Sequence, residues 1–341
     1  MVERVPWGAG RRRQGSARTM RSPRSDSPRF ARPRLVLSQC LELDACRYDG
    51  ASVRAPVVRR LAEHVELMPI CPEVAVGLGV PRAPIRLVRR RGGTVLIQPT
   101  TGHDLTEPMH HFTSRYLRDL PEVEGFLLKA RSPSCGIHGV KVFLGAHAAL
   151  PVGRDAGQFA AAVLARFPDH PVEHERRLTN PRLLDAFLTG LFTLAGVRCA
   201  RDQDGSAAGL VALHSRHQLT GIMFSSQDRN GLDRIVEESD ANAEEAWRAY
   251  AVAFRRAWAR TPGAAGHLKA IQYVTRYLGK RLSPAEGRRL DGLREGFRSG
   301  GVLRSALVAF LRELVARCGL DRLAGQVYLN PYPPALGEVA D

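Results

Sequence analysis

The feature that most constrains the fold of this chain is a set of three cysteines, each placed just after a short apolar run typical of a β-strand. They are Cys40, Cys71 and Cys135, separated by 31 and 64 residues. Because neighbouring strands can end at one edge of a sheet, three such thiolates are expected to converge on one point. Three soft ligands on one point favour a thiophilic metal or an iron–sulfur cluster. A lone cysteine after a strand is more often a buried core thiol, but the Pro, Gly and polar neighbours here indicate backbone shaped for a site.

From residue 34 to about residue 150 the chain alternates short apolar runs with helical stretches. This alternation is typical of an α/β domain with a mainly parallel sheet, and we predict a Rossmann-like α/β domain over residues 33–150. The predicted strands are 35–37, 95–97, 125–128 and 140–143, and the predicted helices are 56–64 and 107–118.

The rest of the chain is predicted to be helical. Residues 151–205 are predicted to form a helical connection, with helices at 155–167 and 181–196 and a turn-rich end. Residues 206–341 are predicted to form an all-α domain, because apolar residues recur every three to four positions. The recurring residues are Trp247, Tyr250, Phe254 and Trp258 in one stretch and Leu303, Leu307, Phe310 and Leu314 in another.

The 341-residue chain has a net charge of +16, which favours a polyanionic partner, with nucleic acid ahead of a membrane. Residues 1–32 hold nine arginines against two acidic residues, a segment charge of +7, and are predicted to form a disordered basic tail. This tail is either an RNA-binding arm or the product of a misassigned start codon, and the remaining +9 keeps the chain basic without it. Free use of arginine by a GC-rich genome is the alternative explanation of the charge.

One helical stretch places cations and an aromatic ring on a single face. Lys269, Tyr273, Arg276 and Lys280 fall at i, i+4, i+7 and i+11, which is the spacing of one face of an α-helix. Such a face can contact phosphates and stack a base. A solvated helix face without a ligand is the alternative.

No continuous apolar run reaches the roughly 18 residues that a membrane span needs, and the N-terminus lacks the apolar core of a secretory signal. Six cysteines in a chain of this length do not make a disulfide scaffold. We therefore expect no membrane partner and a reducing, cytoplasmic location, where thiolates are free to bind metal.

Three motifs together resemble the thiouracil desulfidase family. They are SQC with CRYDG at 38–50, CPE with a glycine-rich turn and PR at 71–82, and KARSPSCG at 129–136. The resemblance implies an iron–sulfur desulfidase domain over residues 33–150. Further along, VALHSRHQL and QVYLNPYPPAL resemble a helical domain often fused to it. Such fusions are similar to desulfidases that convert 4-thiouridine in transfer RNA to uridine, so residues 206–341 are implied to hold the RNA.

By this resemblance, Cys40, Cys71 and Cys135 match the three ligands of a 4Fe–4S cluster, and Glu73 and Ser132 match the catalytic positions. An iron without a protein thiolate is a Lewis acid for the thiocarbonyl sulfur, and hydrosulfide would leave on that open iron. Glu73 would act as general base and then as acid, and Ser132 would hold the water or the base edge. No net electron transfer is required. Without the resemblance, the more common roles are a helix-start carboxylate for Glu73 and a turn or cap residue for Ser132.

Cys46, six residues after Cys40, would close the open iron if it were a fourth ligand. CRYDG belongs to the family pattern, whose ligands match the other three cysteines, so Cys46 is predicted to lie near the site unbound. If all four thiolates bound zinc or a saturated cluster, the chain would be a non-catalytic RNA-binding protein. Desulfuration of free thiouracil or thionucleosides is the other alternative. Cys199 and Cys318 are predicted to be core thiols.

The sequence has no Walker loop and no G-x-G-x-x-G, G-x-S-x-G or H-E-x-x-H motif. The remaining candidates are polar residues expected to contact substrate or RNA, with structural salt bridges as the alternative for the three in the first domain and capping or a metal pair as the alternative for the two histidines. They are Arg47, Asp49 and Arg82 in the first domain and His214, Arg216, His217, Lys269, Arg276 and Lys280 in the second.

Overall fold

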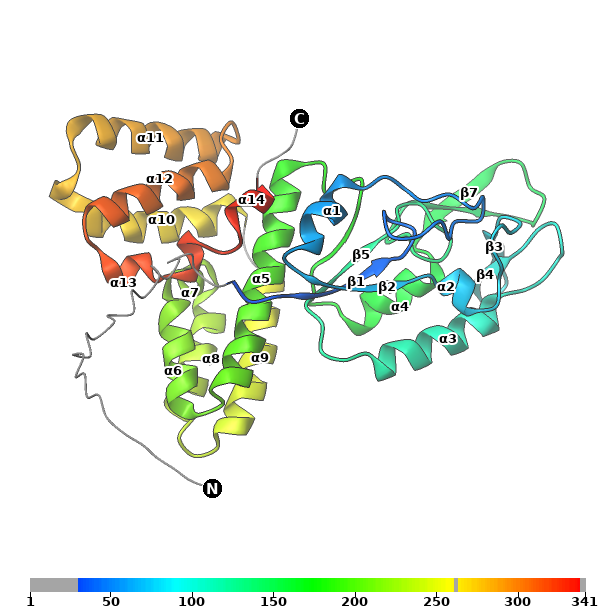
Figure 1. Ribbon diagram of the computed structural model, residues 1–341, viewed down its shortest axis with the longest axis horizontal. Helices are drawn as coiled ribbons and strands as arrows, with labels where there is room; N and C mark the ends of the chain where they lie inside the picture. The colour runs from blue at the N-terminus through cyan, green and yellow to red at the C-terminus, as the bar shows by residue number, and fades with distance from the viewer. Residues whose placement is uncertain (1–29, 261–262, 338–341) are drawn as a thin grey trace, which may run out of the picture.

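The computed structural model describes residues 30–260 and 263–337. It shows an α/β part and a helical part on opposite sides of the long helix α5 (Pro181–Gln203) (Figure 1). An α/β N-terminal part followed by many helices agrees with the predicted fold class, while the Rossmann-like label stays a prediction. The predicted disordered tail, residues 1–32, lies outside the described residues except for residues 30–32.

Four parallel strands form the first sheet. They are β1 (Arg34–Ser38), β2 (Glu66–Ile70), β5 (Gly125–Leu128) and β8 (Val172–His174). The order is β2–β1–β5–β8, so that β1 lies between β2 and β5. All side chains of β5 and most of β1 are buried, as expected for a parallel sheet covered on both faces.

The second sheet has four strands and is mixed. They are β3 (Arg86–Arg90), β4 (Gly93–Ile97), β6 (Val140–Phe143) and β7 (Pro151–Asp155), in the order β4–β3–β6–β7. Strands β3 and β6 are parallel, and the outer strands pair antiparallel to them. The hairpin between β3 and β4 turns at Arg91 and Gly92, because Arg90 pairs with Gly93, and Gly92 has a positive φ (95°), a conformation that glycine adopts without steric cost. The predicted parallel arrangement therefore holds for the first sheet and not for the second.

Four helices of the α/β part cover these sheets. They are α1 (Pro56–Ala62), α2 (Pro72–Ala75), α3 (Thr106–Asp119) and α4 (Gln158–Arg166). Alternate side chains of β1 belong to two cores, because successive residues of a strand face opposite sides. Leu35 and Leu37 pack with α1 and α5, and Val36 packs with α3, α4 and the second sheet. The segment 151–205, predicted to be a helical connection, contains β7 and β8, so both sheets extend beyond residue 150.

Helix α5 is buried along most of its length. Asn180 caps its start by accepting a hydrogen bond from the backbone N–H of Arg182 (2.9 Å). The helix continues through residues 196–203, which sequence analysis predicts to be turns, because buried Val197 and Arg198 hold that end in the core. By its length, and by the composition of an 18-residue window within it, α5 could cross a membrane, although it contains no unbroken apolar run of that length. As in a core helix, 67% of that window is buried inside the protein.

The helical part contains two cores. Its helices are α6 (Ala207–Arg216), α7 (Gln218–Met223), α8 (Ser226–Glu237), α9 (Ala243–Ala259), α10 (Ala264–Leu278), α11 (Pro284–Ser299), α12 (Arg304–Arg317), α13 (Asp321–Ala324) and α14 (Pro334–Gly337). In one core Trp247, Tyr250 and Phe254 of α9 are buried, as their spacing predicts. The other core forms around α10 and α12. The chain then returns to the α/β part, where Tyr332 and Leu336 pack beside α5.

Candidate functional site

The three cysteines predicted as ligands meet at the carboxyl ends of three neighbouring strands. Cys40 lies two residues after β1, Cys71 follows β2 directly and precedes α2, and Cys135 lies in the loop after β5. All three line one cavity of about 370 Å³, called here the thiol cavity. The structure therefore brings together side chains that are far apart in the sequence.

The donor set of the thiol cavity suits soft cations. Burial, followed by repulsion from Cys135 and Cys46, raises the pKa of the Cys40 thiol above its ordinary value. Burial raises the pKa of Cys135 to about 12. A cation among these sulfurs reverses the repulsion, because the thiolate is the form that binds metal. The sulfur-rich lining thus supplies the donor set that suits an iron–sulfur cluster.

A single metal ion has no preformed site in the described part of the chain. Residues 30–260 and 263–337 contain no group of three or more His, Cys, Asp or Glu side chains spaced to hold one ion. A structural zinc would need four donors at about 2–2.3 Å.

Cys46 lies at the same cavity in the irregular segment between β1 and α1. Its backbone carbonyl accepts a hydrogen bond from Arg82 Nη1 (3.0 Å) and lies 3.9 Å from Cys71 Sγ. Burial, followed by the charge of Cys71, raises the pKa of the Cys46 thiol to about 12. Cys46 is thus the fourth thiol of the cavity, and its substitution distinguishes three ligands from four.

Glu73 is a buried carboxylate held from two sides. Arg82 donates to its Oε2 through Nε (2.9 Å) and Nη2 (2.7 Å), and Ser134 donates to its Oε1 (2.7 Å). The Arg82 and Glu73 side chains are only 5% and 12% exposed, so solvent screens their attraction weakly. Glu73 is therefore fixed in one orientation at the cavity wall. Arg82 is predicted to contact substrate or RNA, but in the structure its guanidinium donates hydrogen bonds to Glu73 and to the backbone carbonyls of Cys46 and Gly79.

The loop that carries Cys135 has a strained backbone. Arg131 has φ of 61°, a left-handed conformation that costs energy for a non-glycine residue and occurs often at functional sites. Ser132 Oγ accepts the backbone N–H groups of Ser134 (3.2 Å) and Cys135 (3.1 Å), which closes a turn. The Ser132 and Ser134 hydroxyls lie 2.9 Å apart. The two serines and Glu73 therefore form one hydrogen-bonded row.

Ser132 is predicted from the sequence and Ser134 is not, although both belong to KARSPSCG. Ser134 lies closer to Glu73 Oε1 than Ser132 does, at 2.7 Å against 3.4 Å. The second hydroxyl of S-P-S is the sequence signal, but only the fold shows which one reaches Glu73. The loop is also held by Gly157 at the start of α4, where a Cβ would lie 2.5 Å from the Ser134 carbonyl oxygen.

Lys129 and Glu175 form a second ion pair at the cavity that sequence analysis misses. Lys129 Nζ donates to Glu175 Oε1 (2.7 Å), and the backbone N–H of Ala130 donates to Oε2 (2.8 Å). The backbone N–H of Lys129 donates to the Ser38 hydroxyl (2.9 Å). These bonds join the ends of β1, β5 and β8 beneath the site. The only sequence signal is the first residue of KARSPSCG.

Two further cavities with many cations border the thiol cavity. Arg47 and Lys129 also line the first basic cavity, of about 520 Å³, together with Arg54 and Arg176. Arg131 also lines the second basic cavity, of about 350 Å³, again with Arg176. Arg54, Arg131 and Arg176 are exposed and form no ion pair within the described ranges. Such arginines suit phosphate oxygens.

The other residues predicted to contact RNA are scattered. Arg47 pairs with Asp49 (3.2 Å) beside the thiol cavity. Arg216 and Lys280 are exposed, Lys280 in the short 3-10 turn η1 (Gly279–Arg281). Burial lowers the pKa of His217 to about 3, so it supplies no positive charge at neutral pH. His214, His217, Lys269 and Arg276 line a separate cavity in the helical part.

Comparisons with known proteins match each part of the chain to a family. Residues 35–175 match a family described as 2-thiouracil desulfurase, and residues 221–333 match one described as a protein of unknown function, DUF1722. The uncharacterized protein YbbK of Bacillus subtilis (strain 168) is 30% identical over 109 residues, which cover 30% of this chain and 72% of that protein. A solved structure, the 4Fe–4S-dependent thiouracil desulfidase TudS, is 28% identical, with 43% of this chain and 93% of that chain covered and a TM-score of 0.33.

Proposed function

We propose that this chain, which belongs to the 2-thiouracil desulfurase family through residues 35–175, removes sulfur from 4-thiouridine in transfer RNA and leaves uridine. The observation that carries the proposal is the thiol cavity, where three strand-end cysteines share one space with Glu73 and a serine pair. The thiols can hold a centre that binds sulfur, and the buried carboxylate beside them can move protons. Family membership gives the desulfidase domain, and the substrate is the proposed part.

Cys40, Cys71 and Cys135 are the residues that we propose hold a 4Fe–4S cluster. When bound, such a cluster would supply a Lewis-acidic iron with affinity for sulfur. The three thiols follow the adjacent parallel strands β1, β2 and β5, so the sheet positions them. Cys46 comes from an irregular segment instead, and we propose that it stays unbound.

Glu73 is placed to transfer protons. Its Oε2 is occupied by Arg82, so Oε1 is the oxygen proposed to take a proton from an attacking water. The water oxygen bonds to the ring carbon that carries sulfur, the carbon–sulfur bond breaks, and the proton returns through Glu73 to the departing sulfide. The second proton of the water leaves the new ring hydroxyl for solvent as the carbonyl forms, so water and a thiocarbonyl give a carbonyl, hydrosulfide and a proton, with no electron supplied or removed.

The two serines divide their roles by burial. Ser134 is fully buried and donates to Glu73, so its proposed role is to orient the carboxylate. Ser132 is only partly buried at the cavity wall. Ser132 is therefore the hydroxyl proposed to contact the water or the edge of the base.

The basic cavities support a substrate that carries phosphate. A free thiobase carries no phosphate that Arg54, Arg131 and Arg176 could contact beside the thiol cavity. A nucleotide within RNA presents a phosphate on each side of the reacting base. Transfer RNA is thus the proposed partner, the helical part its proposed second contact, and a reducing cytoplasm the proposed location.

Desulfuration of free thiouracil is the second candidate, because a cavity of about 370 Å³ accommodates a single base. Protein reconstituted anaerobically with iron and sulfide separates the two. We expect a higher kcat/KM for thiolated transfer RNA, followed by its near-ultraviolet absorbance, than for free thiouracil. If free thiouracil loses sulfur while transfer RNA keeps it, the substrate proposal is wrong and the desulfidase domain stands.

A further inference from the structure

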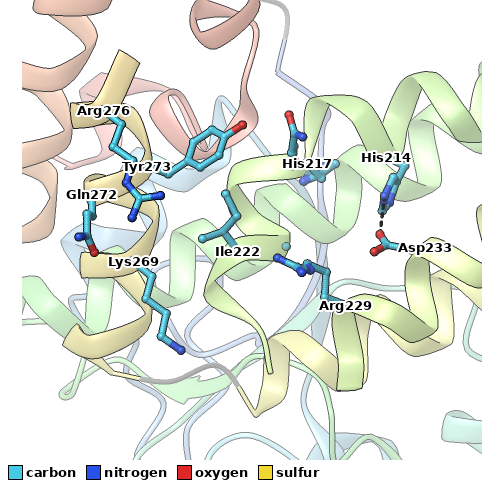
Figure 2. A pocket seen from close by; sticks show the side chains of 11 residues that line it. His214, His217, Ile222, Arg229, Asp233, Lys269, Gln272, Tyr273 and Arg276 are labelled. Carbon is cyan, nitrogen blue, oxygen red and sulfur yellow. Dashed lines mark ion pairs between the residues drawn. The ribbon is translucent and has the colours of Figure 1, made fainter. Parts of the chain in front are cut away.

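The helical part has a cavity of about 430 Å³, called here the helical cavity, with walls from α6, α7, α8 and α10. Figure 2 shows Lys269, Gln272, Tyr273 and Arg276 along one wall, all from α10, and Arg229 of α8 extending toward them from the opposite wall. Helix α9 separates α8 from α10 in the chain. The two walls therefore meet only through packing of the helices.

Three cations of the helical cavity have no acidic partner. Arg229, Lys269 and Arg276 are exposed and make no ion pair with any residue that the structure describes. The acidic side chain in the lining, Asp233, is already engaged by His214, with Nε2 3.1 Å from Oδ1 (Figure 2). The three cations outnumber the one carboxylate of the lining, Asp233, so they repel one another, and a bound anion relieves that repulsion.

The walls also hold a ring in a fixed position. Tyr273 is partly buried, and its hydroxyl lies 3.0 Å from that of Tyr277, with ring centroids 5.1 Å apart. Because neighbouring contacts restrict the ring, Tyr273 offers a flat face at a low cost in conformational entropy. Cations beside such a ring bind a nucleotide by phosphate contact and base stacking. A cavity of about 430 Å³ is large enough for one nucleotide.

Building on the proposed function, we propose that the helical cavity binds one nucleotide of transfer RNA, with its phosphate among Arg229, Lys269 and Arg276 and its base against Tyr273. The thiol cavity belongs to the sheets on the other side of α5 (Figure 1). A single nucleotide cannot occupy both cavities, whereas a polynucleotide can, and each contact then raises the effective concentration of the other. The helical cavity therefore anchors RNA at a second point away from the reacting base.

Binding of transfer RNA without thiolated nucleotides to the full chain tests this inference, because no turnover is needed. Fluorescence anisotropy over a range of salt gives both the affinity and its salt dependence. Lys269→Ala and Arg276→Ala should each weaken binding roughly tenfold and reduce the slope of log K against log salt by about 1. Tyr273→Ala should weaken binding roughly tenfold through lost stacking, while Tyr273→Phe, which keeps the ring, should not.

Arg288→Ala is the matched control for charge, because Arg288 is an exposed arginine of α11 outside the helical cavity. An equal loss of affinity in Arg288→Ala would show that RNA responds to net charge alone and would overturn the inference. Unchanged binding by both Lys269→Ala and Tyr273→Ala would overturn it too, as would competition by free uridine monophosphate at the concentration of the RNA. If the wild-type protein removes no sulfur but these variants still lose RNA binding, the inference about the helical cavity holds and the proposed reaction is refuted.

Discussion

Replacement of Glu73 by glutamine tests its acid–base role while keeping the shape of the side chain. In the structure the carboxylate accepts two bonds from Arg82 (2.9 and 2.7 Å) and one from Ser134 (2.7 Å). The glutamine oxygen can still face Arg82, and its amide can donate to the Ser134 oxygen. Glu73→Gln should therefore stay folded with its side chain in place but without the negative charge.

The two effects of Glu73→Gln differ greatly in size. Hydrogen bonds to charged groups contribute about 1.5–3 kcal/mol, so the free energy of unfolding should fall by about 2 kcal/mol. A general acid–base group contributes about 10²–10⁴-fold to a rate, so kcat should fall by that factor. Since domains are stable by about 5–15 kcal/mol, most of the variant remains folded. The loss of kcat then comes from chemistry and not from unfolding.

Activity is measured with anaerobically reconstituted protein as loss of the near-ultraviolet absorbance of thiolated transfer RNA, with the visible absorbance of the cluster recorded alongside. Glu124→Gln is the matched control, because Glu124 forms a buried ion pair with Arg198 (2.6 Å) that does not line the thiol cavity. The control should lose similar stability and keep its kcat. A Glu73→Gln protein that carries cluster and turns over at the wild-type rate would refute the acid–base role.

Cys46→Ala should retain iron and visible absorbance, whereas Cys71→Ala should lose both; loss of iron from both variants would indicate four ligands. Burial lowers the pKa of His217 from 6.5 to about 3, so below pH 6.5 the unfolded chain binds a proton that the folded chain does not. Stability is thus full above pH 6.5 and falls toward pH 3, by about 2–3 kcal/mol from this group at about pH 4.5. His217→Phe should remove that part of the loss when urea unfolding is compared at about pH 7.5 and about pH 4.5. In the wild type, Arg304 Nη2 lies 2.6 Å from Asp185 Oδ1, and Arg304→Met leaves this mostly buried carboxylate without its cationic partner and with the Tyr332 hydroxyl as its remaining donor. The free energy of unfolding should fall by about 3–5 kcal/mol, and an unchanged Tm would contradict this.

The meeting of the three cysteines could be predicted from local patterns and one rule of topology. Each follows a strand-like run, and parallel strands end at the same edge of their sheet. Glu73 reaches the site with Cys71, two residues before it. The role of Ser134 could not be found in this way, because its contact with Glu73 spans 61 residues and depends on the left-handed turn at Arg131.

The missed elements have physical causes as well. Gly92 lies in the tight hairpin between β3 and β4, and the prediction of one mainly parallel sheet does not include this antiparallel pair. The end of α5 has a turn-forming composition, but buried Val197 and the pairing of Arg198 with Glu124 outweigh local propensity. A local turn decides the first case, and tertiary contacts decide the second.

The helical cavity shows the same limit. Periodicity along one helix finds Lys269, Tyr273 and Arg276, because all three lie on one face of α10. It cannot find Arg229, which arrives from α8 through packing of separate helices. The sequence therefore predicts a basic helix face, and the structure turns that face into one wall of a cavity.

The most direct test of the proposed function is nucleoside analysis by mass spectrometry of thiolated transfer RNA incubated with reconstituted protein in water labelled with heavy oxygen. We predict that 4-thiouridine disappears, that an equal amount of uridine appears, and that this uridine carries the label, because water supplies the new carbonyl oxygen. Transfer RNA that keeps all of its 4-thiouridine in the presence of cluster-loaded protein would contradict the proposal.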